Sequence, residues 1–255
     1  MDAVDFSFYK ELKAVELQLQ QEIYFKAGNF DELVQLPLND LGQHGHPAIV
    51  LAVSRACGYQ GDQSIRLASI IQYVYIADQV HGLMRDDEEL PEENRQFPVL
   101  VGDALYGNFF LGLCRGNMLN FLEPLAEVIC TMNEGAISRW RFKDQELDTA
   151  QQLIILGQER ASLTSRAAGL SAQLAGVNGA LLQQIEEFGR CVGMAWAAYE
   201  QNMAGTVVAD FAQRGLDLLH QLPADGDLRW LYEFYDYLLE RVLPESGLSP
   251  AYPKG

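Results

Sequence analysis

The chain has 255 residues, of which 49% are hydrophobic and 10% aromatic, so it can bury a sizeable globular core. Its formal net charge of −17 at pH 7 argues against direct binding to nucleic acid or to an anionic membrane surface, because both require basic patches. The same charge argues against unaided binding of a polyphosphate, unless metal ions or a partner's cations neutralise it.

The sequence shows no clear signal peptide, membrane span or paired-cysteine motif. Asp2, Asp5 and Lys10 interrupt any early apolar run of the kind a signal peptide needs. The longest uncharged stretch, residues 167–185, contains three glycines and several polar residues and is too polar to span a bilayer. The four cysteines show no Cys-x-x-Cys spacing. We therefore expect a cytoplasmic protein that is not membrane-spanning, with its cysteines as reduced core thiols.

The first half of the chain predicts helices in the following order. Apolar residues at three- and four-residue spacing indicate a helix from about Phe8 to Ile23. A short helix beginning at Pro47 follows, and then a long one from Ile65 to Val80. The long helix has apolar residues on nearly every face, which is typical of a buried helix. Residues 86–93 contain six carboxylates, and a solvated acidic loop is the commonest explanation of such a run.

The second half continues the helical pattern. Helices are predicted over residues 97–114 and 121–140, from a cap at Asp144 toward Gln173, over 181–210 and over about 227–242. No segment alternates with a period of two for long, and there is no Gly-rich phosphate loop. The pattern predicts an all-α fold, with residues 1–255 forming one domain of about ten helices.

Several short segments occur in an order and spacing that resemble the trans-isoprenyl diphosphate synthase (polyprenyl synthetase) family over most of the chain. They are Pro47 with Cys57-Gly58-Tyr59, Val99-Leu100-Val101-Gly102-Asp103, Glu134-Gly135, Glu159-Arg160-Ala161-Ser162-Leu163, Phe188 to Trp196, and Leu219 to Pro223. No single segment is specific, but their order is. The resemblance implies the isoprenoid-synthase fold and a dimer. The chain is shorter than the family pattern after Asp86 and after the second acidic motif.

The residues that carry the family's chemistry are mostly replaced. In the family, two DDxxD motifs hold Mg²⁺ on an allylic diphosphate, and a GGKRLRP loop grips the second diphosphate. Hard cations need several oxygen ligands, and carboxylates one helical turn apart supply them on one face. The matching positions here are Gly82, Leu83 and Asp86 for the first motif, Glu200, Gln201 and Ala204 for the second, and Gln43, His44 and His46 for the diphosphate loop.

Other positions of the family's site also depart from the pattern. Gln72 stands at a Glu of the family, Tyr75 at a His, and Glu159-Arg160 near its Lys-Thr pair. Asp78 lies four residues before the first motif, on the tunnel side, where an unpaired carboxylate would cost several kcal/mol.

The selective loss of charged site residues on a kept scaffold predicts a catalytically degenerate member, a pseudoenzyme of isoprenoid biosynthesis. The resemblance implies a non-catalytic subunit of a heterodimeric long-chain prenyl diphosphate synthase, forming a homo- or heterodimer with or without a catalytic subunit. No cofactor is expected under this interpretation.

Two alternatives stay open. The chain would be an active Mg²⁺-dependent prenyltransferase or class I terpene cyclase if Asp86 and Asp87 formed the metal pair. Asn202, Thr206 and Asp210 have the spacing of the second cyclase motif and, on a helix, would share one face. The third interpretation is a module that binds an isoprenoid without chemistry, since helix bundles host apolar cavities.

Overall fold

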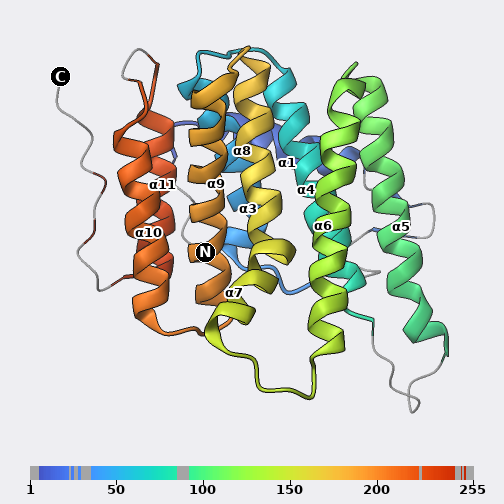
Figure 1. Ribbon diagram of the computed structural model, residues 1–255. Helices are drawn as coiled ribbons and strands as arrows, with labels where there is room; N and C mark the ends of the chain where they lie inside the picture. Colours follow the sequence, from blue (N-terminus) through green and yellow to red (C-terminus); the bar gives the residue numbers. More distant parts are fainter. Residues whose placement is uncertain are drawn as a thin grey trace.

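In the computed structural model the described residues are 6–22, 24–25, 28–29, 36–84, 92–223, 226–244, 248 and 250. They form a helical bundle (Figure 1), which confirms the predicted all-α class. The helices are α1 (Tyr9–Glu22), α3 (Asp40–Ala56), α4 (Gln63–His81), α5 (Glu92–Arg115), α6 (Leu122–Arg141), α7 (Thr149–Leu156), α8 (Ser162–Leu174), α9 (Gly179–Glu200), α10 (Gly205–His220) and α11 (Arg229–Val242). A 3₁₀ turn, η1 (Leu119–Phe121), precedes α6, and a π-helical turn, η2 (Gly157–Ala161), joins α7 to α8. Two short strands, β1 (Tyr24–Phe25) and β2 (Gly28–Asn29), pair antiparallel.

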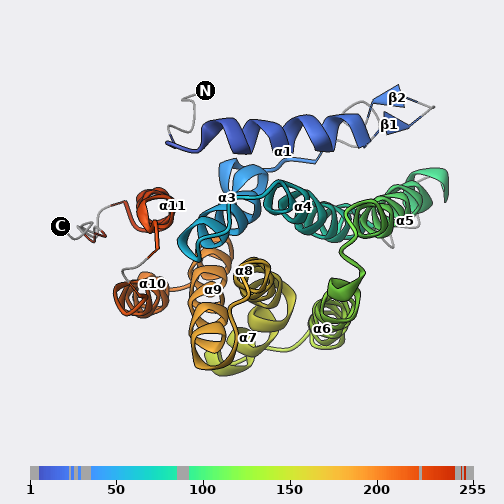
Figure 2. The ribbon, with the colours of Figure 1, turned by 90° about the horizontal axis from the view of Figure 1, so that it is seen from above.

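The bundle has a central group of helices with others around it. Seen from above, α3, α4, α8 and α9 lie toward the middle, and α1 crosses one side (Figure 2). Helices α10 and α11 lie at one edge, and α5 and α6 at the other. Every residue of α4 from Leu67 to Ala77 is buried, which confirms the buried central helix that its apolar composition predicts.

Helices α8 and α9 approach each other closely because small residues face the contact. A Cβ atom on Gly193 would lie 2.7 Å from the Cα atom of Ala161, the last residue of η2 and the N-cap of α8. One turn earlier, a Cβ on Gly189 would lie 2.8 Å from the carbonyl oxygen of Thr164. Backbones at this distance leave no room for a side chain, so the two glycines fix the helix spacing.

Helix α3 begins at Asp40, well before the predicted start at Pro47. Asn39 caps it, because its side-chain oxygen accepts a hydrogen bond of 2.8 Å from the amide of Gly42. Pro47 has no N–H to donate to the carbonyl of Gln43. The Nε2 atom of Gln72 on α4 lies 3.5 Å from that oxygen and donates at 2.9 Å to the carbonyl of Gly42. A partner on a neighbouring helix therefore compensates for a proline inside α3.

Two other predicted boundaries are wrong. Asp148, rather than Asp144, caps α7, where it forms a capping box with Gln151. The predicted helix over residues 181–210 is two helices, because α9 ends at Glu200 and α10 begins at Gly205. In the turn between them, Asn202 has a φ of 51°, in the left-handed region that Asn tolerates better than most residues.

All four cysteines are free, but the expectation that they are core thiols is wrong for two. Cys191 is buried and Cys57 is half-buried, whereas Cys114 and Cys130 are exposed.

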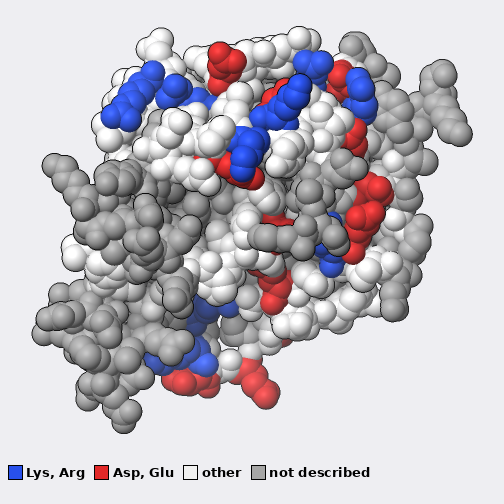
Figure 3. All heavy atoms as spheres, turned by 180° about the vertical axis from the view of Figure 1, so that it is seen from behind, with Lys and Arg blue, Asp and Glu red and all other residues white. Residues whose placement is uncertain are grey.

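One helical segment of the described chain, Phe97–Arg115, is long and apolar enough by length and composition to cross a membrane. This is weak evidence for a span, because core helices of soluble proteins meet the same criterion. On the face shown in Figure 3, many Lys and Arg side chains lie along the upper edge with acidic side chains beside them. The described residues of this face thus form no uninterrupted basic patch of the kind that nucleic acid needs.

Candidate functional site

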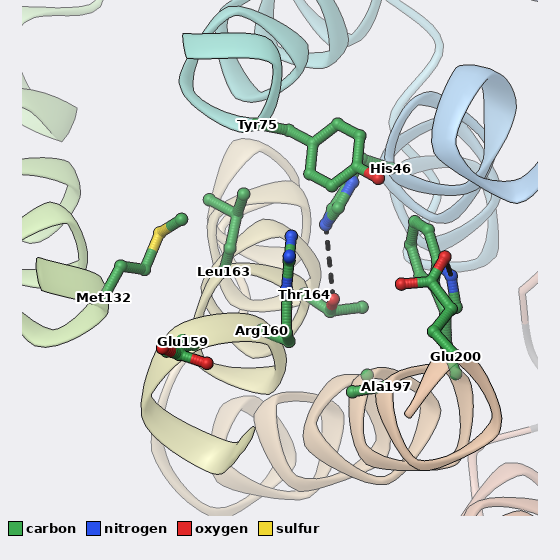
Figure 4. A pocket seen from close by; sticks show the side chains of 11 residues that line it. His46, Tyr75, Met132, Glu159, Arg160, Leu163, Thr164, Ala197 and Glu200 are labelled. Atoms are coloured by element: carbon green, nitrogen blue, oxygen red, sulfur yellow. Dashed lines mark hydrogen bonds between the residues drawn. The ribbon is translucent and has the colours of Figure 1, made fainter. Parts of the chain in front are cut away.

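A small pocket lies where α3, α4, α6, η2, α8 and α9 meet (Figure 4). Its free volume is about 10 Å³, which is room for about one water molecule. Side chains therefore leave little free space in this pocket. The lining residues are His46, Tyr75, Met132, Glu159, Arg160, Leu163, Thr164, Gly193, Trp196, Ala197 and Glu200.

Three rings fill one side of the pocket. The ring centroid of His46 lies 4.7 Å from that of Tyr75 and 5.0 Å from that of Trp196. The centroids of Tyr75 and Trp196 are 5.9 Å apart. Trp196 reaches this position because residue 45 is glycine, where a Cβ atom would lie 3.0 Å from the Cζ3 atom of the indole. The cluster joins α3, α4 and α9.

His46 is the one predicted diphosphate-loop residue that lines the pocket. Its Nε2 atom lies 3.3 Å from the hydroxyl oxygen of Thr164, and its Nδ1 atom is buried without a hydrogen-bond partner. Burial, assisted by the positive charge of Arg160, lowers the pKa of His46 to about 3. His46 is therefore neutral at pH 7 and supplies no positive charge for a phosphate.

Arg160, which lines the pocket, forms an ion pair with Asp78 of α4, which does not. A guanidinium nitrogen of Arg160 lies 3.4 Å from a carboxylate oxygen of Asp78, and the side chains are each 29% exposed. Figure 4 shows the Arg160 side chain extending into the pocket beside Thr164 and Leu163. Burial raises the pKa of Asp78, and Arg160 opposes this rise only in part. Asp78 is therefore not an unpaired carboxylate. Its pairing with Arg160 offsets part of the cost of burying its charge.

Glu159 has a cation of its own. The guanidinium of Arg139 on α6 donates hydrogen bonds to both carboxylate oxygens of Glu159, two of them at 2.8 Å. The hydrogen bond from Arg139 to Glu159 is also what raises the pKa of Arg139. The same guanidinium lies 3.5 Å from the side-chain oxygen of Gln201. Two neighbouring residues of η2 therefore have separate counter-charges. Glu159 pairs with Arg139 on α6, and Arg160 pairs with Asp78 on α4.

Glu200 of the second degenerate motif is also engaged within the protein. Its carboxylate accepts a hydrogen bond of 2.7 Å from the indole nitrogen of Trp196 and one of 3.2 Å from the side-chain amide of Asn39. It thus ties the end of α9 to the cap of α3.

The remaining predicted site residues lie away from the pocket. Gly82 and Leu83 are exposed at the end of α4, and Gln201 and Ala204 are exposed between α9 and α10. The predicted diphosphate loop is the first two turns of α3 rather than a loop. In those turns, Gln43 donates to the carbonyl of Leu38, and His44 lies 3.8 Å from Glu16. The first-motif residue Asp86 and its neighbour Asp87 lie outside the described residues.

The predicted alternative metal motif is not a single helical face. Asn202 lies in the turn before α10, whereas Thr206 and Asp210 are exposed on α10. The carboxylate of Asp210 lies 3.9 Å from Arg214. None of the three lines the pocket. The expectation that all three share one helix is therefore wrong, and a metal site using them stays a prediction.

The described residues do not fit a Mg²⁺ site. Among them, no three His, Cys, Asp or Glu side chains come together as a metal site. Each carboxylate near the pocket already has a partner in the protein: Asp78 has Arg160, Glu159 has Arg139, and Glu200 has Trp196. Mg²⁺ needs free oxygen ligands in near-octahedral geometry, which these pairs do not offer.

Two residues of the site do not emerge from the sequence as site residues. Arg139 and Trp196 each hold one of the carboxylates at the pocket. The charge reversal at Glu159 was a usable signal for Arg139, because a buried carboxylate needs a cation on a facing helix. The Trp196 contact has a weaker signal, since Trp196 and Glu200 are four residues apart on one helix.

No family model matches the chain. Its sequence is 25% identical over 164 residues to the octaprenyl diphosphate synthase of Escherichia coli (strain K12). That match covers 61% of this chain and 51% of the relative, so the chain spans about half the length of the curated relative it matches.

Solved structures extend the likeness to nearly the whole chain. The fold is similar to that of a polyprenyl synthase from Caulobacter crescentus CB15 complexed with calcium and isoprenyl diphosphate, with a TM-score of 0.78 and 19% identity over 91% of this chain and 96% of that one. A deletion mutant of a heterotetrameric geranyl pyrophosphate synthase from mint has a TM-score of 0.65 and 16% identity over 92% and 98% of the two chains. The sequence relatives and structural neighbours are thus trans-isoprenyl diphosphate synthases, which confirms the resemblance found in the sequence.

Proposed function

We propose that this chain, which has the fold of the trans-isoprenyl diphosphate synthases, is a non-catalytic subunit of a cytoplasmic prenyl diphosphate synthase. The observation that carries the proposal is the pocket, whose charged side chains each have an ion-pair or hydrogen-bond partner within the protein and whose free volume is about 10 Å³. A catalytic site for a prenyl diphosphate needs an open apolar channel and unpaired cationic groups for the phosphates.

Binding a diphosphate here would be costly. Arg160 would have to leave Asp78, and Arg139 would have to leave Glu159. Removing one partner of a partly buried ion pair leaves a charge without compensation. The three carboxylates at the site, those of Asp78, Glu159 and Glu200, would also repel the phosphates. These costs oppose diphosphate binding before any chemistry begins.

The subunit role rests on the kept scaffold. The helices that form the pocket and the close α8–α9 packing are intact, although the charged residues of the family's site are replaced. One structural neighbour is a heterotetrameric synthase, which supports a place for this fold in mixed assemblies. The partner we propose is a motif-complete prenyl diphosphate synthase of the same organism.

The test combines activity with complex formation. We expect the isolated chain with Mg²⁺, allylic diphosphates and isopentenyl diphosphate to give no product. Co-purified with a motif-complete synthase, it should form a stable complex and change the rate or the product length of that enzyme.

The control is a complex in which the partner's own first DDxxD motif is disabled. Such a complex should be inactive, because this chain contributes no catalysis. Absence of a complex, together with unchanged activity and product length, would overturn the proposal. Mg²⁺-dependent turnover by this chain alone would instead favour the prenyltransferase or terpene cyclase interpretation. An isoprenoid-binding module is less well supported, because the pocket has room for about one water.

A further inference from the structure

A second and much larger cavity lies where α6, η2, α8 and α9 meet, on the side of the bundle that α1 does not cover (Figure 2). Its free volume is about 440 Å³, which is within the range of small-molecule sites. This polar cleft is lined by Glu127, Thr131, Ser162, Ser165, Arg166 and Glu186, among others. None of its lining residues lines the pocket around His46, so the two sites are separate.

The three hydroxyl groups of the polar cleft present hydrogen-bond acceptors. Each donates its hydrogen to a backbone carbonyl oxygen, at 3.0 Å (Thr131 to Glu127), 2.6 Å (Ser162 to Gln158) and 2.8 Å (Ser165 to Glu186). A carbonyl oxygen cannot donate, so the single hydrogen of each hydroxyl is already used and only its lone pairs stay available. A ligand in the cleft therefore needs N–H or O–H groups to pair with these oxygens.

Two carboxylates of the cleft, from different helices, share one loosely held guanidinium. Glu127 of α6 lies 3.7 Å from one terminal nitrogen of Arg166, and Glu186 of α9 lies 3.5 Å from the other. Charge-assisted hydrogen bonds between such groups are normally about 2.7–2.9 Å long, so neither contact is fully formed. Both carboxylates therefore keep lone pairs for a further donor. Their oxygens are less than about 10 Å apart, because both lie close to the same small, planar guanidinium.

Glu186 is positioned by its contacts with α8. A Cβ atom on Gly169 would lie 2.6 Å from the Oε1 atom of Glu186, so a side chain at that position would push the carboxylate away. The backbone carbonyl of Glu186 accepts the hydrogen bond from Ser165. These contacts place the carboxylate in the cleft before any ligand binds, which reduces the entropy lost on binding.

The cleft favours a cation over an anion. Its second guanidinium, that of Arg190, already donates to both carboxylate oxygens of Glu187, at 2.7 and 2.9 Å. Arg166 has two carboxylates within 3.7 Å, and these would repel a phosphate or a carboxylate ligand. The net charge of −17 acts in the same direction. A divalent metal ion fits less well, because it needs about six oxygen ligands and, among the described residues, no three ligating side chains come together.

We propose that the polar cleft binds a small aliphatic diamine or polyamine. One ammonium group pairs with Glu127 and another with Glu186, and their remaining N–H groups donate to the hydroxyl oxygens. The methylene groups between the ammonium groups contact Val128, the buried aliphatic side chain of the lining. The cleft shares no residue with the pocket, so the proposal does not depend on whether the chain is catalytic.

Isothermal titration calorimetry at low salt tests the proposal, with putrescine and spermidine as probes. We expect saturable binding that weakens as salt is added, because the contacts are ionic. Butylamine has one ammonium group, and Nα-acetyl-lysine amide models a single lysine side chain of a partner protein. Each should bind at least about tenfold more weakly than putrescine, because it reaches only one carboxylate. Equal binding of either compound, a stronger response to inorganic phosphate or Mg²⁺ than to putrescine, or no binding of the two probes overturns the proposal.

Charge-removing variants locate the site. Glu186→Gln and Glu127→Gln should each raise the dissociation constant of spermidine about tenfold, since each removes one charge-assisted contact. The Glu127 side chain is 63% exposed, so that variant should fold even if the change at Glu186 disturbs α9. The matched control is Glu240→Gln on α11, where the side chain is 70% exposed and lies outside the cleft. Equal weakening in all three variants would reduce the effect to net charge and overturn the site.

Arg166→Gln separates a cation site from an anion site, because the two predict opposite signs. Removal of the guanidinium leaves Glu127 and Glu186 without their shared counter-charge, so spermidine should bind about three- to tenfold more tightly. A site for anions would lose its main cation and bind its ligand more weakly. Circular dichroism of the variant checks that its helices stay intact. Weaker binding of spermidine by an intact Arg166→Gln variant overturns the proposal.

Discussion

Arg160 of η2, which lines the pocket, lies 3.4 Å from Asp78 of α4. The contact is long for an ion pair with hydrogen bonding, and both side chains keep some access to water. Arg160 nevertheless supplies the counter-charge that the partly buried carboxylate of Asp78 requires. Asp78 and Arg160 should thus behave as a unit in mutation.

The first prediction concerns that unit. Arg160→Met should lower the free energy of unfolding by about 1–2 kcal/mol, less than for a fully buried pair because both side chains are partly exposed. Asp78→Asn combined with Arg160→Gln should be less destabilising than the sum of the two single changes. Urea unfolding of the unaltered chain, Asp78→Asn, Arg160→Gln and the double variant measures this coupling. Strict additivity would show that the two side chains do not interact.

The second prediction is a pH dependence at Asp78. Its folded pKa is raised above the usual 3.8, with burial as the main cause. The fold therefore favours the protonated carboxyl, and this stabilisation is lost as pH rises from about 3.8 through the raised value. Asp78→Asn mimics the protonated form. Its free energy of unfolding should thus increase relative to that of the unaltered chain between pH 3 and pH 7, and a constant difference would contradict the shift.

The third prediction has the opposite sign and concerns His46. Its pKa falls from 6.5 to about 3 in the fold, so the unfolded chain binds a proton more readily between these values. Stability from this group is present above pH 6.5 and is lost on acidification, by roughly 2 kcal/mol between pH 7 and pH 5. His46→Gln should remove that part of the pH dependence in urea unfolding. The exposed His220, changed to Gln, should leave it unaltered.

The fourth prediction tests the helix contact at Pro47. Gln72→Glu keeps the side-chain shape but removes the donor that serves the carbonyls of Gly42 and Gln43, and it buries a carboxyl group beside two oxygens. We expect a loss of at least about 2–3 kcal/mol in the free energy of unfolding. Gln152→Glu, at an exposed position that also donates to a carbonyl, should change stability by less than about 1 kcal/mol. Similar losses in the two variants would rule out a special role for Gln72.

The fifth prediction concerns the α8–α9 spacing. Gly193→Ala would place a Cβ atom 2.7 Å from the Cα atom of Ala161, where the backbone must move. The cost should be about 2–3 kcal/mol, and the thermal midpoint should fall accordingly. At Gly205, the first residue of α10, a Cβ atom would have no neighbour within 4 Å, so Gly205→Ala should be neutral or slightly stabilising. If the two variants have the same thermal midpoint, close backbone packing is not what fixes the spacing.

The fold was largely predictable because its signals are local. Apolar composition on all faces of α4 and the three- and four-residue spacing in α1 are properties of short segments. The start of α3 is not predictable from its local sequence, because a proline inside a helix is tolerated only where another group compensates for its missing N–H. That group belongs to Gln72, twenty-five residues after Pro47, and no short segment contains both.

The site was predictable in position and less so in chemistry. The resemblance predicts His46, Asp78 and Glu200 as site residues; His46 and Glu200 line the pocket, and Asp78 pairs with Arg160, which lines it. The side chains that pair with the carboxylates of the site are not predictable in this way. Arg139 precedes Glu159 by twenty residues, and only the packing of α6 against η2 brings the two together.

The π-helical turn η2 sets the rotation of α7 relative to α8. A π turn accommodates one residue more than an α turn, so α7 is out of phase with α8 by about 100°, the rotation of one residue. Deleting a single residue within 157–161 would restore a regular helix and swing α7 around the axis of α8. Glu159 and Arg160 could then no longer both keep their counter-ions, so the surplus residue sets the phase on which both ion pairs depend.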